Sequence, residues 1–242
     1  MARIGIIGSS GRMGEALARA IVAGGHDLAG GADRGDDPAR LADASDALVD
    51  FSAPAALEGN IHAAVGAGIP ILIGTTGLEA VHHAMIDSAA GAIPVLQTGN
   101  TSLGVTLLAH LVAEAAARLG PDWDVEVVEM HHRMKVDAPS GTALLLGEAA
   151  AAGRGITLAD HSERGRDGQT GARAPDAIGF ASLRGGTVAG EHSVILAGEQ
   201  ERIVLSHMAE DRMIFAHGAI RAAAWLISRA PGRYSMAQVL GL

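Results

Sequence analysis

Residues 126–146, EVVEMHHRMKVDAPSGTALLL, combine groups that could move a proton with groups that could hold an anion. The adjacent histidines His131 and His132 are followed by Lys135. On extended backbone two neighbouring rings point to opposite sides, so only one of them easily faces a given ligand. We therefore expect one histidine to be catalytic and the other to support it.

A helix N-terminus after the histidines would complete an anion site. Ser140 can cap a helix whose first N–H groups, on Gly141 and Thr142, point at a docked anion. Pro139 fixes its own φ and keeps Ala138 extended, which makes the approach to that helix rigid. The segment therefore predicts an anion site that also carries an acid.

Each of these residues also has an ordinary structural explanation. A single histidine is more often structural than catalytic, a loop lysine is usually solvated, and a histidine pair could bind a metal. We expect no metal, because the chain has no cysteine and His-His-x-x-Lys matches no usual ligand spacing.

Two elements must position this segment. Residues 123–129 mix β-branched valines with acidic residues and predict a strand, whereas residues 142–152 are helix formers and predict a helix. The chemistry is therefore expected where a strand ends.

The start of the chain carries a second motif. An apolar strand predicted at residues 3–7 leads into GSSGRMG at residues 8–14, and a helical pattern follows at residues 15–22. This order of strand, glycine turn and helix is the context that a dinucleotide fingerprint requires. The glycines allow a tight turn and let a pyrophosphate approach the backbone at the helix N-terminus.

An acidic and a basic residue follow the next predicted strand, residues 27–32. Asp33 and Arg34 lie about twenty residues beyond the turn, where a carboxylate accepts the ribose hydroxyls of NAD and an arginine can meet a 2′-phosphate. Because both are present, we expect tolerance of NADH or NADPH. A polar loop is the alternative interpretation.

The first hundred residues continue in a regular alternation. Predicted strands at residues 47–51, 70–73 and 94–97 alternate with helical runs at residues 55–67 and 78–90. This alternation is typical of a Rossmann-type, doubly wound parallel sheet in an α/β protein.

Glycine-containing turns follow two of these strands, at residues 74–77 and 99–102. Ligands of open α/β sheets bind at the carboxyl ends of the strands, so both turns are placed to touch a cofactor. They could equally be ordinary turns.

The sequence changes character after residue 100. We expect a helix at residues 104–119, with Glu114 and Arg118 paired at helical spacing. The face that we expect this helix to bury consists of Leu107, Leu108, Leu111 and Ala115.

A second domain is expected from the patterns that follow. Residues 159–176 read as a long polar loop, and predicted strands at residues 178–183, 193–197 and 202–207 are close enough to suggest antiparallel pairing. The last helix, residues 213–228, is apolar enough to pack on the first domain. We therefore expect a dinucleotide-binding domain of residues 1–102 plus 212–242, and a second α+β domain on a mixed or antiparallel sheet at residues 103–211.

Composition limits the classes of partner. A formal net charge of −9 and scattered arginines argue against nucleic acid. No apolar run approaches membrane-spanning length and no signal peptide is evident, so we expect no membrane partner and a cytoplasmic location. An anionic ligand must therefore be held by local positive groups.

Five separated motifs resemble one known family, the 4-hydroxy-tetrahydrodipicolinate reductases, also called dihydrodipicolinate reductases. They lie in order at residues 8–14, 74–77, 126–142, 178–192 and 215–221. The resemblance runs nearly from end to end. It implies a homotetramer, built through the sheet of the second domain, that reduces a cyclic dicarboxylate with NADH or NADPH in lysine and diaminopimelate biosynthesis.

The resemblance also implies roles for individual residues. His131 corresponds to the catalytic acid and base, and Lys135 to a second proton donor. The residues that correspond to substrate-binding positions are His132, Ser140, Gly141 and Thr142. The residues that correspond to cofactor contacts are Gly8, Ser9, Ser10, Gly11, Arg12, Met13, Asp33, Arg34, Gly74, Thr75, Thr76, Thr98, Gly99, Asn100 and Thr101.

Two positions depart from the family pattern. Thr101 stands where many members have an aromatic residue, which leaves only a backbone contact to the nicotinamide. Ala53 stands where some members have an arginine, and the loss of that phosphate contact favours NADH. Two alternatives are another two-domain NAD(P)-dependent dehydrogenase and a non-enzymatic NAD(H)-binding redox sensor, for which His131 and Lys135 would be incidental.

Overall fold

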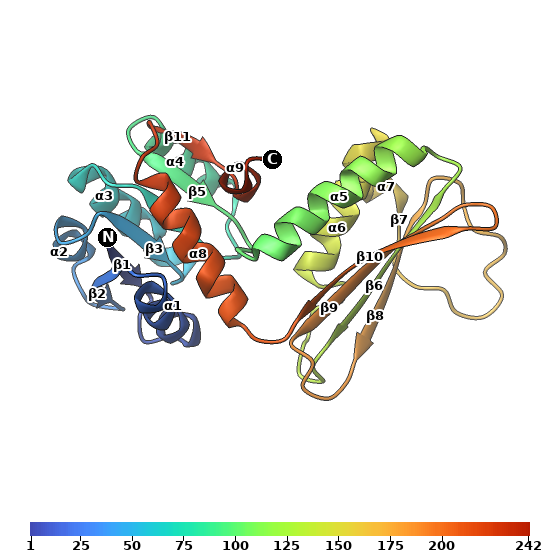
Figure 1. Cartoon of the computed structure of the whole chain (residues 1–242), viewed down its shortest axis with the longest axis horizontal. Helices are drawn as coiled ribbons and strands as arrows, with labels where there is room; N and C mark the ends of the chain where they lie inside the picture. The colour runs from blue at the N-terminus through green and yellow to red at the C-terminus, as the bar shows by residue number, and fades with distance from the viewer. The chain divides into compact units, whose positions relative to one another are not determined.

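The computed structural model describes residues 1–242 and divides into two compact units. The first unit comprises Met1–Leu103 and Arg212–Leu242, and the second comprises Gly104–Asp211. Both chain termini belong to the first unit (Figure 1).

The first unit is built on a six-stranded sheet in the order β11-β5-β4-β3-β1-β2, and every pairing is parallel. Its strands are β1 (Arg3–Ile7), β2 (Asp27–Ala32), β3 (Ala47–Asp50), β4 (Ile71–Ile73), β5 (Pro94–Gln97) and β11 (Gly232–Tyr234). The predicted doubly wound parallel sheet is confirmed. Sequence analysis did not predict β11, because its three residues, GRY, carry no apolar run.

Helices cover both faces of this sheet, which is why strands such as β3 are buried along their whole length. The helical segments are α1 (Arg12–Ala23), α2 (Pro38–Asp43), η1 (Pro54–Ala56), α3 (Leu57–Ala67), α4 (Ala80–Ala90), α8 (Met213–Leu226) and α9 (Met236–Leu240). One core contains residues of α1, α8 and α9, and a second core contains residues of α2, α3 and α4.

Helix α8 brings the end of the chain back onto the first unit, where it packs against α1 and crosses in front of the parallel strands (Figure 1). Gly218 permits a very close approach, since a Cβ at this position would lie only 1.8 Å from the carbonyl oxygen of Thr101. A second contact joins the same segments, because Thr101 Oγ1 donates to the carbonyl oxygen of Phe215 at 2.7 Å.

The second unit contains a five-stranded mixed sheet in the order β10-β9-β6-β8-β7. Its strands are β6 (Asp124–His131), β7 (Ser162–Glu163), β8 (Ile178–Arg184), β9 (Gly190–Ala197) and β10 (Arg202–Ala209). The predicted antiparallel pairing holds for β9 with β10. It is wrong for β8, which pairs in parallel with β6, because β6 lies between β8 and β9 in the sheet.

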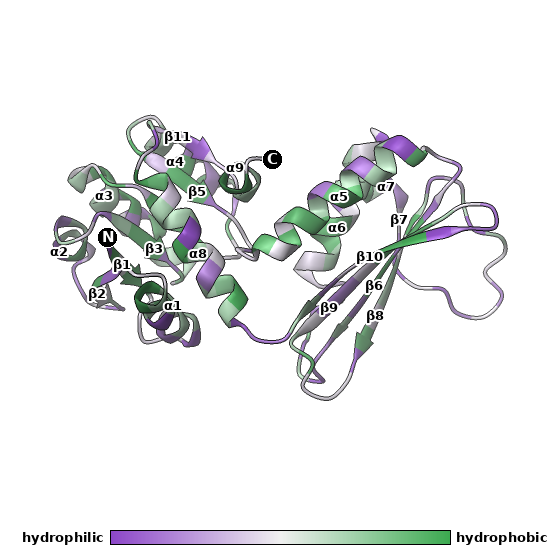
Figure 2. Cartoon of the chain, viewed as in Figure 1, coloured by the Kyte–Doolittle hydropathy of each residue, from purple (hydrophilic) through white to green (hydrophobic).

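Helices α5 (Leu103–Leu119) and α6 (Gly141–Arg154) contribute the helical side of a core shared with this sheet. The predicted buried face of α5 is partly wrong, since Leu107 and Leu111 are each 44% exposed. The residues of α5 that are buried are Val105, Leu108, Val112 and Ala116. Apolar residues lie on several sides of α5, as its colouring in Figure 2 shows. The positions of the apolar residues alone therefore do not identify the side of the helix that is buried.

The predicted polar loop at residues 159–176 begins later than expected. Helix α7 (Leu158–His161) and β7 occupy its first residues, and residues 164–177 contain neither helix nor strand. Arg166 and Arg173 hold this segment to the sheet through Glu126, at 2.9 and 3.0 Å.

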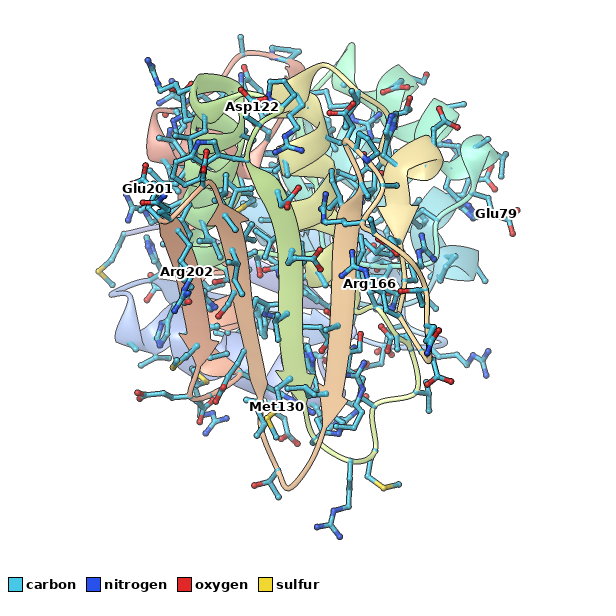
Figure 3. All side chains as sticks on the ribbon, turned by 90° about the vertical axis from the view of Figure 1, so that its right-hand side faces the viewer. Glu79, Asp122, Met130, Arg166, Glu201 and Arg202 are labelled. Carbon is cyan, nitrogen blue, oxygen red and sulfur yellow. The ribbon has the colours of Figure 1, made fainter.

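No helix of the second unit covers the opposite face of the sheet, which Figure 3 shows towards the viewer. Apolar side chains on this open face are exposed to 50% at Leu183, 50% at Val204 and 66% at Met208. None of the helices in the structure is both long and apolar enough to cross a membrane.

Candidate active site

The alternation of buried and partly buried side chains along strand β6 positions His131. Val125, Val127, Glu129 and His131 are all buried, while the residues between them are only partly buried. His131 is thus the last residue of the strand, two residues beyond its predicted end. His132 follows directly after the end of the strand and is half-buried.

The carboxylate of Glu129 contacts the ring of His131, with Oε2 2.5 Å from Nδ1. Arg184 of β8 donates to both carboxylate oxygens of Glu129, at 2.8 and 2.9 Å. The backbone N–H of Ser140 donates to the same carboxylate at 3.2 Å. The Glu129 side chain is only 1% exposed, so this buried carboxylate is bound by donors on several sides.

The charge on Glu129 follows from these contacts. Burial raises the pKa of its carboxyl group, but hydrogen bonds from Arg184, His131 and Ser182 outweigh burial and lower the pKa to about 2. Glu129 is therefore ionised at neutral pH and presents a negative charge to His131.

His192 of β9 lies on the other side of this cluster and is 5% exposed. Its Nε2 is 3.1 Å from Ser140 Oγ, and its Nδ1 has no hydrogen-bond partner. The pKa of His192 is lowered to about 4. Burial is the largest cause, and the nearby His131 is the next. His192 is therefore neutral at neutral pH.

Lys135 lies in the loop between β6 and α6, with its Nζ 2.9 Å from Asp137 Oδ1. Its backbone N–H donates to the carbonyl oxygen of His132 at 3.1 Å, which closes a tight turn. The hydrogen bond from Lys135 is the main reason that the pKa of Asp137 is lowered. Lys135 also lies close enough to His192 to lower the pKa of that ring.

The N-terminus of α6 completes this cluster. Ser140 is the N-cap, as predicted, and its Oγ accepts from the backbone N–H of Ala143 at 3.1 Å. Gly141 and Thr142 form the start of the helix, and no atom lies within 4 Å of the position that a Cβ on Gly141 would take. The side-chain position of Gly141, at the first turn of α6, is therefore open.

A cavity of about 660 Å³ lies in the first unit, at the carboxyl ends of β1, β2 and β3. The strand order reverses between β1 and β3, and open α/β sheets bind their ligands at such a switch point. The residues lining it include Gly8, Ser10, Gly11, Asp33, Arg34, Ser52, Ala53 and Asn60.

The glycine turn has the geometry that its sequence predicts. Gly8 has φ +84°, a conformation that L side chains rarely adopt. A Cβ on Gly14 would lie 2.3 Å from the carbonyl oxygen of Ser9, so α1 can approach the turn only with glycine there.

Asp33 holds this turn in place. Its carboxylate accepts from Ser9 Oγ at 2.6 Å and from Ser10 Oγ at 2.9 Å. The Ser10 backbone N–H donates to the same carboxylate at 3.1 Å. The hydrogen bond from Ser9 is the largest reason that the pKa of Asp33 is lowered, so the side chain is anionic at the cavity wall.

The other predicted cofactor residues lie outside this cavity lining. Arg12 and Met13 begin α1, and Met13 packs against the core. Thr101 is 2% exposed and directs its hydroxyl to α8. Thr98 Oγ1 accepts from the Asn100 backbone N–H at 3.1 Å within a turn. The remaining residues outside the lining are Ser9, Gly74, Thr75, Thr76 and Gly99.

Sequence analysis missed a buried network beneath the cavity. Asp50, at the end of β3, accepts from Ser52 Oγ at 2.6 Å and from Asn60 Nδ2 at 2.9 Å. Thr75 Oγ1 donates to the same carboxylate at 3.2 Å. The sequence offered one indication of this network, because the acidic residue Asp50 ends the otherwise apolar strand ALVD.

It also missed Glu129, Arg184 and His192 as members of the histidine cluster. Glu129 could have been found, because residues two apart on a strand share a face. No group of three or more metal-ligand side chains is present that could hold a metal ion.

The fold and the two sites define the class of protein. A Rossmann-type unit with a cavity at its switch point, joined to a second unit with a buried histidine and carboxylate pair, is typical of a dinucleotide-dependent oxidoreductase.

Comparison with known families identifies the protein more closely. The family described as "Dihydrodipicolinate reductase, N-terminus" matches residues 2–101, and "Dihydrodipicolinate reductase, C-terminus" matches residues 104–240. The chain belongs to the dihydrodipicolinate reductase family. The predicted resemblance, fold class and enzyme class are confirmed, and the protein is an NAD(P)H-dependent oxidoreductase.

Individual relatives agree with this assignment. The 4-hydroxy-tetrahydrodipicolinate reductase of Zymomonas mobilis is 54% identical over 247 residues, covering 99% of this chain and 97% of the relative. The enzyme of the same name from Rhodopseudomonas palustris (strain BisB18) is 52% identical with the same coverage. The structure of dipicolinate-bound dihydrodipicolinate reductase from Paenisporosarcina sp. TG-14 has a TM-score of 0.74 at 20% identity, and the match covers 97% of each chain. This structural likeness shows the shared fold.

Proposed function

We propose that the protein reduces 4-hydroxy-tetrahydrodipicolinate to tetrahydrodipicolinate, with NADH or NADPH as the hydride donor, in lysine and diaminopimelate biosynthesis. The name of the relatives that are 52% and 54% identical supports this reaction. The observation that carries the proposal is that the ionised Glu129 contacts both the ring of His131 and the backbone N–H of Ser140, at the N-terminus of α6.

The substrate is a dicarboxylate, and the second unit offers several groups that suit a dianion. Lys135 supplies a positive charge, and the first N–H groups of α6, on Gly141 and Thr142, supply directed donors. His132 is half-buried next to His131, and we propose that it holds a carboxylate. A chain with a net charge of −9 thus binds an anion through local groups.

His131 carries the proton transfer in this proposal. Loss of the 4-hydroxyl group of the substrate as water gives a conjugated imine, and hydride addition to that imine leaves an electron-rich carbon that must take up a proton. A histidine suits this task because its ordinary pKa lies close to neutral pH. Lys135 is the second proton donor, and its ammonium group pairs with Asp137.

The first unit fits a nicotinamide dinucleotide. The turn at Gly8, where a Cβ would lie 2.5 Å from the carbonyl oxygen of Phe51, leaves backbone exposed beside the cavity for a pyrophosphate. Asp33 and Arg34 both line the cavity, which supports use of either cofactor. Ala53 lines it without a charge, and we propose that NADH is preferred. The bound cofactor supplies the hydride.

We further propose a homotetramer that assembles through the open face of the second unit's sheet (Figure 3). Leu183, Val204 and Met208 are exposed on that face and support this assembly, because exposed apolar side chains on an uncovered sheet face suit an interaction surface. Light scattering of the purified protein tests it.

The reaction is tested by generating 4-hydroxy-tetrahydrodipicolinate in situ and following the absorbance of NADH or NADPH. We expect cofactor oxidation that depends on both the substrate and the protein. Purified wild-type protein that bound cofactor and yet oxidised none would overturn the proposed function.

A further inference from the structure

We propose that Glu129 is a positioning residue for His131. By accepting a hydrogen bond from the N–H group at Nδ1, Glu129 leaves Nε2 as the atom that exchanges a proton with the substrate, and Arg184 fixes Glu129 in that role. This inference rests on the proposed function, and it adds two residues to the proton-transfer machinery.

The geometry selects one tautomer of His131. An ionised carboxylate only accepts hydrogen bonds, so the 2.5 Å contact between Glu129 Oε2 and His131 Nδ1 requires a proton on Nδ1. The neutral ring then carries its lone pair on Nε2, and the protonated ring carries its transferable proton there. A carboxylate that fixes a histidine in this way sets both its orientation and its tautomer.

Arg184 prevents Glu129 from turning away. Its guanidinium contacts both carboxylate oxygens, a fork that fixes the carboxylate plane. The register of the sheet makes this possible, because Arg184 on β8 lies directly beside His131 on β6. Arg184 also donates to the carbonyl oxygen of Asp137 at 2.6 Å, which ties the pair to the loop that carries Lys135.

Gly190 lies beside Nε2 of His131. A Cβ at this position would come within 3.1 Å of Nε2, so the absence of a side chain there avoids crowding that atom. The ring of His192 packs edge-on against His131 and is neutral, so it adds no competing positive charge. Of the titratable and charged groups in this cluster, Glu129 and His192 contact His131, and Arg184 contacts Glu129. Lys135 and His207 lie close enough to His192 to act on that ring, and Asp137 pairs with Lys135.

The charge on Glu129 also matters for the protonated form of His131. A carboxylate 2.5 Å away stabilises the imidazolium in this buried site, because little solvent screens the pair. Arg184 neutralises part of that charge, and its two hydrogen bonds hold the carboxylate in place.

Replacement of Glu129 by Gln tests the inference, since it keeps the side-chain size and removes the charge. We expect kcat to fall about 10²-fold or more, which is the usual contribution of a positioned acid or base. The alkaline limb of the pH profile of kcat should move to lower pH, because the imidazolium loses its stabilising charge. Affinity for NADH, measured by fluorescence titration, should stay unchanged.

Glu126→Gln is the matched control. Glu126 is on the same strand and is also bound by two arginines, Arg166 and Arg173, but it lies on the opposite face of the sheet from His131. We expect this variant to keep the wild-type pH profile. Arg184→Lys is a second test, because it keeps a cation but loses the fork, and it should lower kcat by a smaller factor than Glu129→Gln.

A measurement without substrate separates this inference from the proposed reaction. The ¹⁵N chemical shifts of histidine rings report their tautomers, and the His131 signals can be assigned by their loss in His131→Asn. We expect the wild-type ring to carry its proton on Nδ1 when neutral, and the tautomers to mix in Glu129→Gln. A wild-type ring protonated on Nε2 alone, or a Glu129→Gln enzyme with wild-type kcat and pH profile, would overturn the role of Glu129. A wild-type protein without reductase activity would overturn only the proposed function.

Discussion

The ring of His192 stands edge-on to the ring of His131, with centroids 5.1 Å apart and ring planes at 75°. The two rings have different partners, since His131 contacts the ionised Glu129 while His192 contacts the hydroxyl of Ser140. Burial lowers the pKa of His192 to about 4, so at neutral pH this ring carries no charge. Of these two adjoining rings, His131 therefore contacts a charged carboxylate, while His192 stays neutral.

The lowered pKa of His192 predicts a loss of stability in mild acid. The unfolded chain binds a proton at the ordinary pKa of 6.5, whereas the folded chain binds it only near 4, so stability falls as the pH drops between these values. From pH 7 to pH 5 the loss from this residue is about 2 kcal/mol, or roughly 4–8 °C in Tm. Thermal melts of wild type and His192→Gln at the two pH values measure it, and the variant should lose less.

The control for this prediction is His110→Gln, because His110 is exposed on α5. Its melting temperature should fall between pH 7 and pH 5 as much as that of the wild type. Glu129 affects stability in a different pH range. Its pKa is lowered to about 2, so its stabilising effect is lost only as the pH falls from about 4.5 towards 2. Equal acid sensitivity of wild type and His192→Gln would contradict the assignment of a neutral His192.

Lys135→Ala should lower kcat by about 10²-fold or more, because it removes the proposed second proton donor. Affinity for NADH should be unchanged, since the dinucleotide cavity is formed by residues of the first unit. Steady-state kinetics and fluorescence titration measure the two effects.

Asp137→Asn is the matched control, because it removes the ion-pair partner of Lys135 and keeps the ammonium group. Asp137 is 53% exposed, and exposed ion pairs contribute about 0–1 kcal/mol, so kcat should stay within about fivefold of wild type. An unchanged kcat in Lys135→Ala would show that the lysine is incidental.

The strands of the first unit could be predicted closely from the sequence. Three of them, β1, β2 and β5, have the predicted bounds, because short apolar runs between glycine and proline residues leave few alternatives. The short strand β11 escaped prediction because its place at the sheet edge is set by pairing with β5 and not by its own residues.

The site could be predicted less completely, and the reason is the sheet of the second unit. His131, Lys135 and Ser140 lie in one continuous segment, so their residue types and spacing indicated the chemistry. Arg184 and His192 come from strands that lie more distant along the chain and reach His131 only because β6 is placed between β8 and β9. The short spacing of the predicted strands at residues 178–183, 193–197 and 202–207 suggested that they pair with one another in chain order. That order would have separated Arg184 and His192 from His131.

Ala53→Arg should increase the use of NADPH. Ala53 lines the same cavity as Asp33 and Arg34, so a guanidinium there can meet a 2′-phosphate. One hydrogen bond to a charged group contributes about 1.5 kcal/mol or more, which corresponds to a rise of roughly tenfold in the ratio of kcat/KM for NADPH to that for NADH.

Arg34→Ala is the complementary variant and should lower the same ratio. The values of kcat/KM for NADH on each variant serve as the internal control, because NADH has no 2′-phosphate. A wild-type enzyme with a large advantage for NADPH would contradict the preference that the uncharged Ala53 predicts.

Asp50→Asn should weaken both the first unit and its cofactor site. Asp50 is fully buried and accepts hydrogen bonds from Ser52, Asn60 and Thr75, so an amide in its place turns an NH₂ group towards these donors. We expect a loss of about 3 kcal/mol, or roughly 6–12 °C in Tm. The dissociation constant for NADH should rise, because Ser52 and Asn60 line the cavity and lose their anchor.

Asp46→Asn is the matched control for this change. Asp46 precedes β3 and pairs with Arg3, whose side chain is 54% exposed, so its loss should cost about 1 kcal/mol or less. Thermal melting and fluorescence titration of NADH should therefore separate the two variants. If Asp50→Asn melted and bound NADH as Asp46→Asn does, the buried carboxylate would have no part in shaping the cavity. A lower Tm with unchanged NADH affinity would assign Asp50 to folding alone.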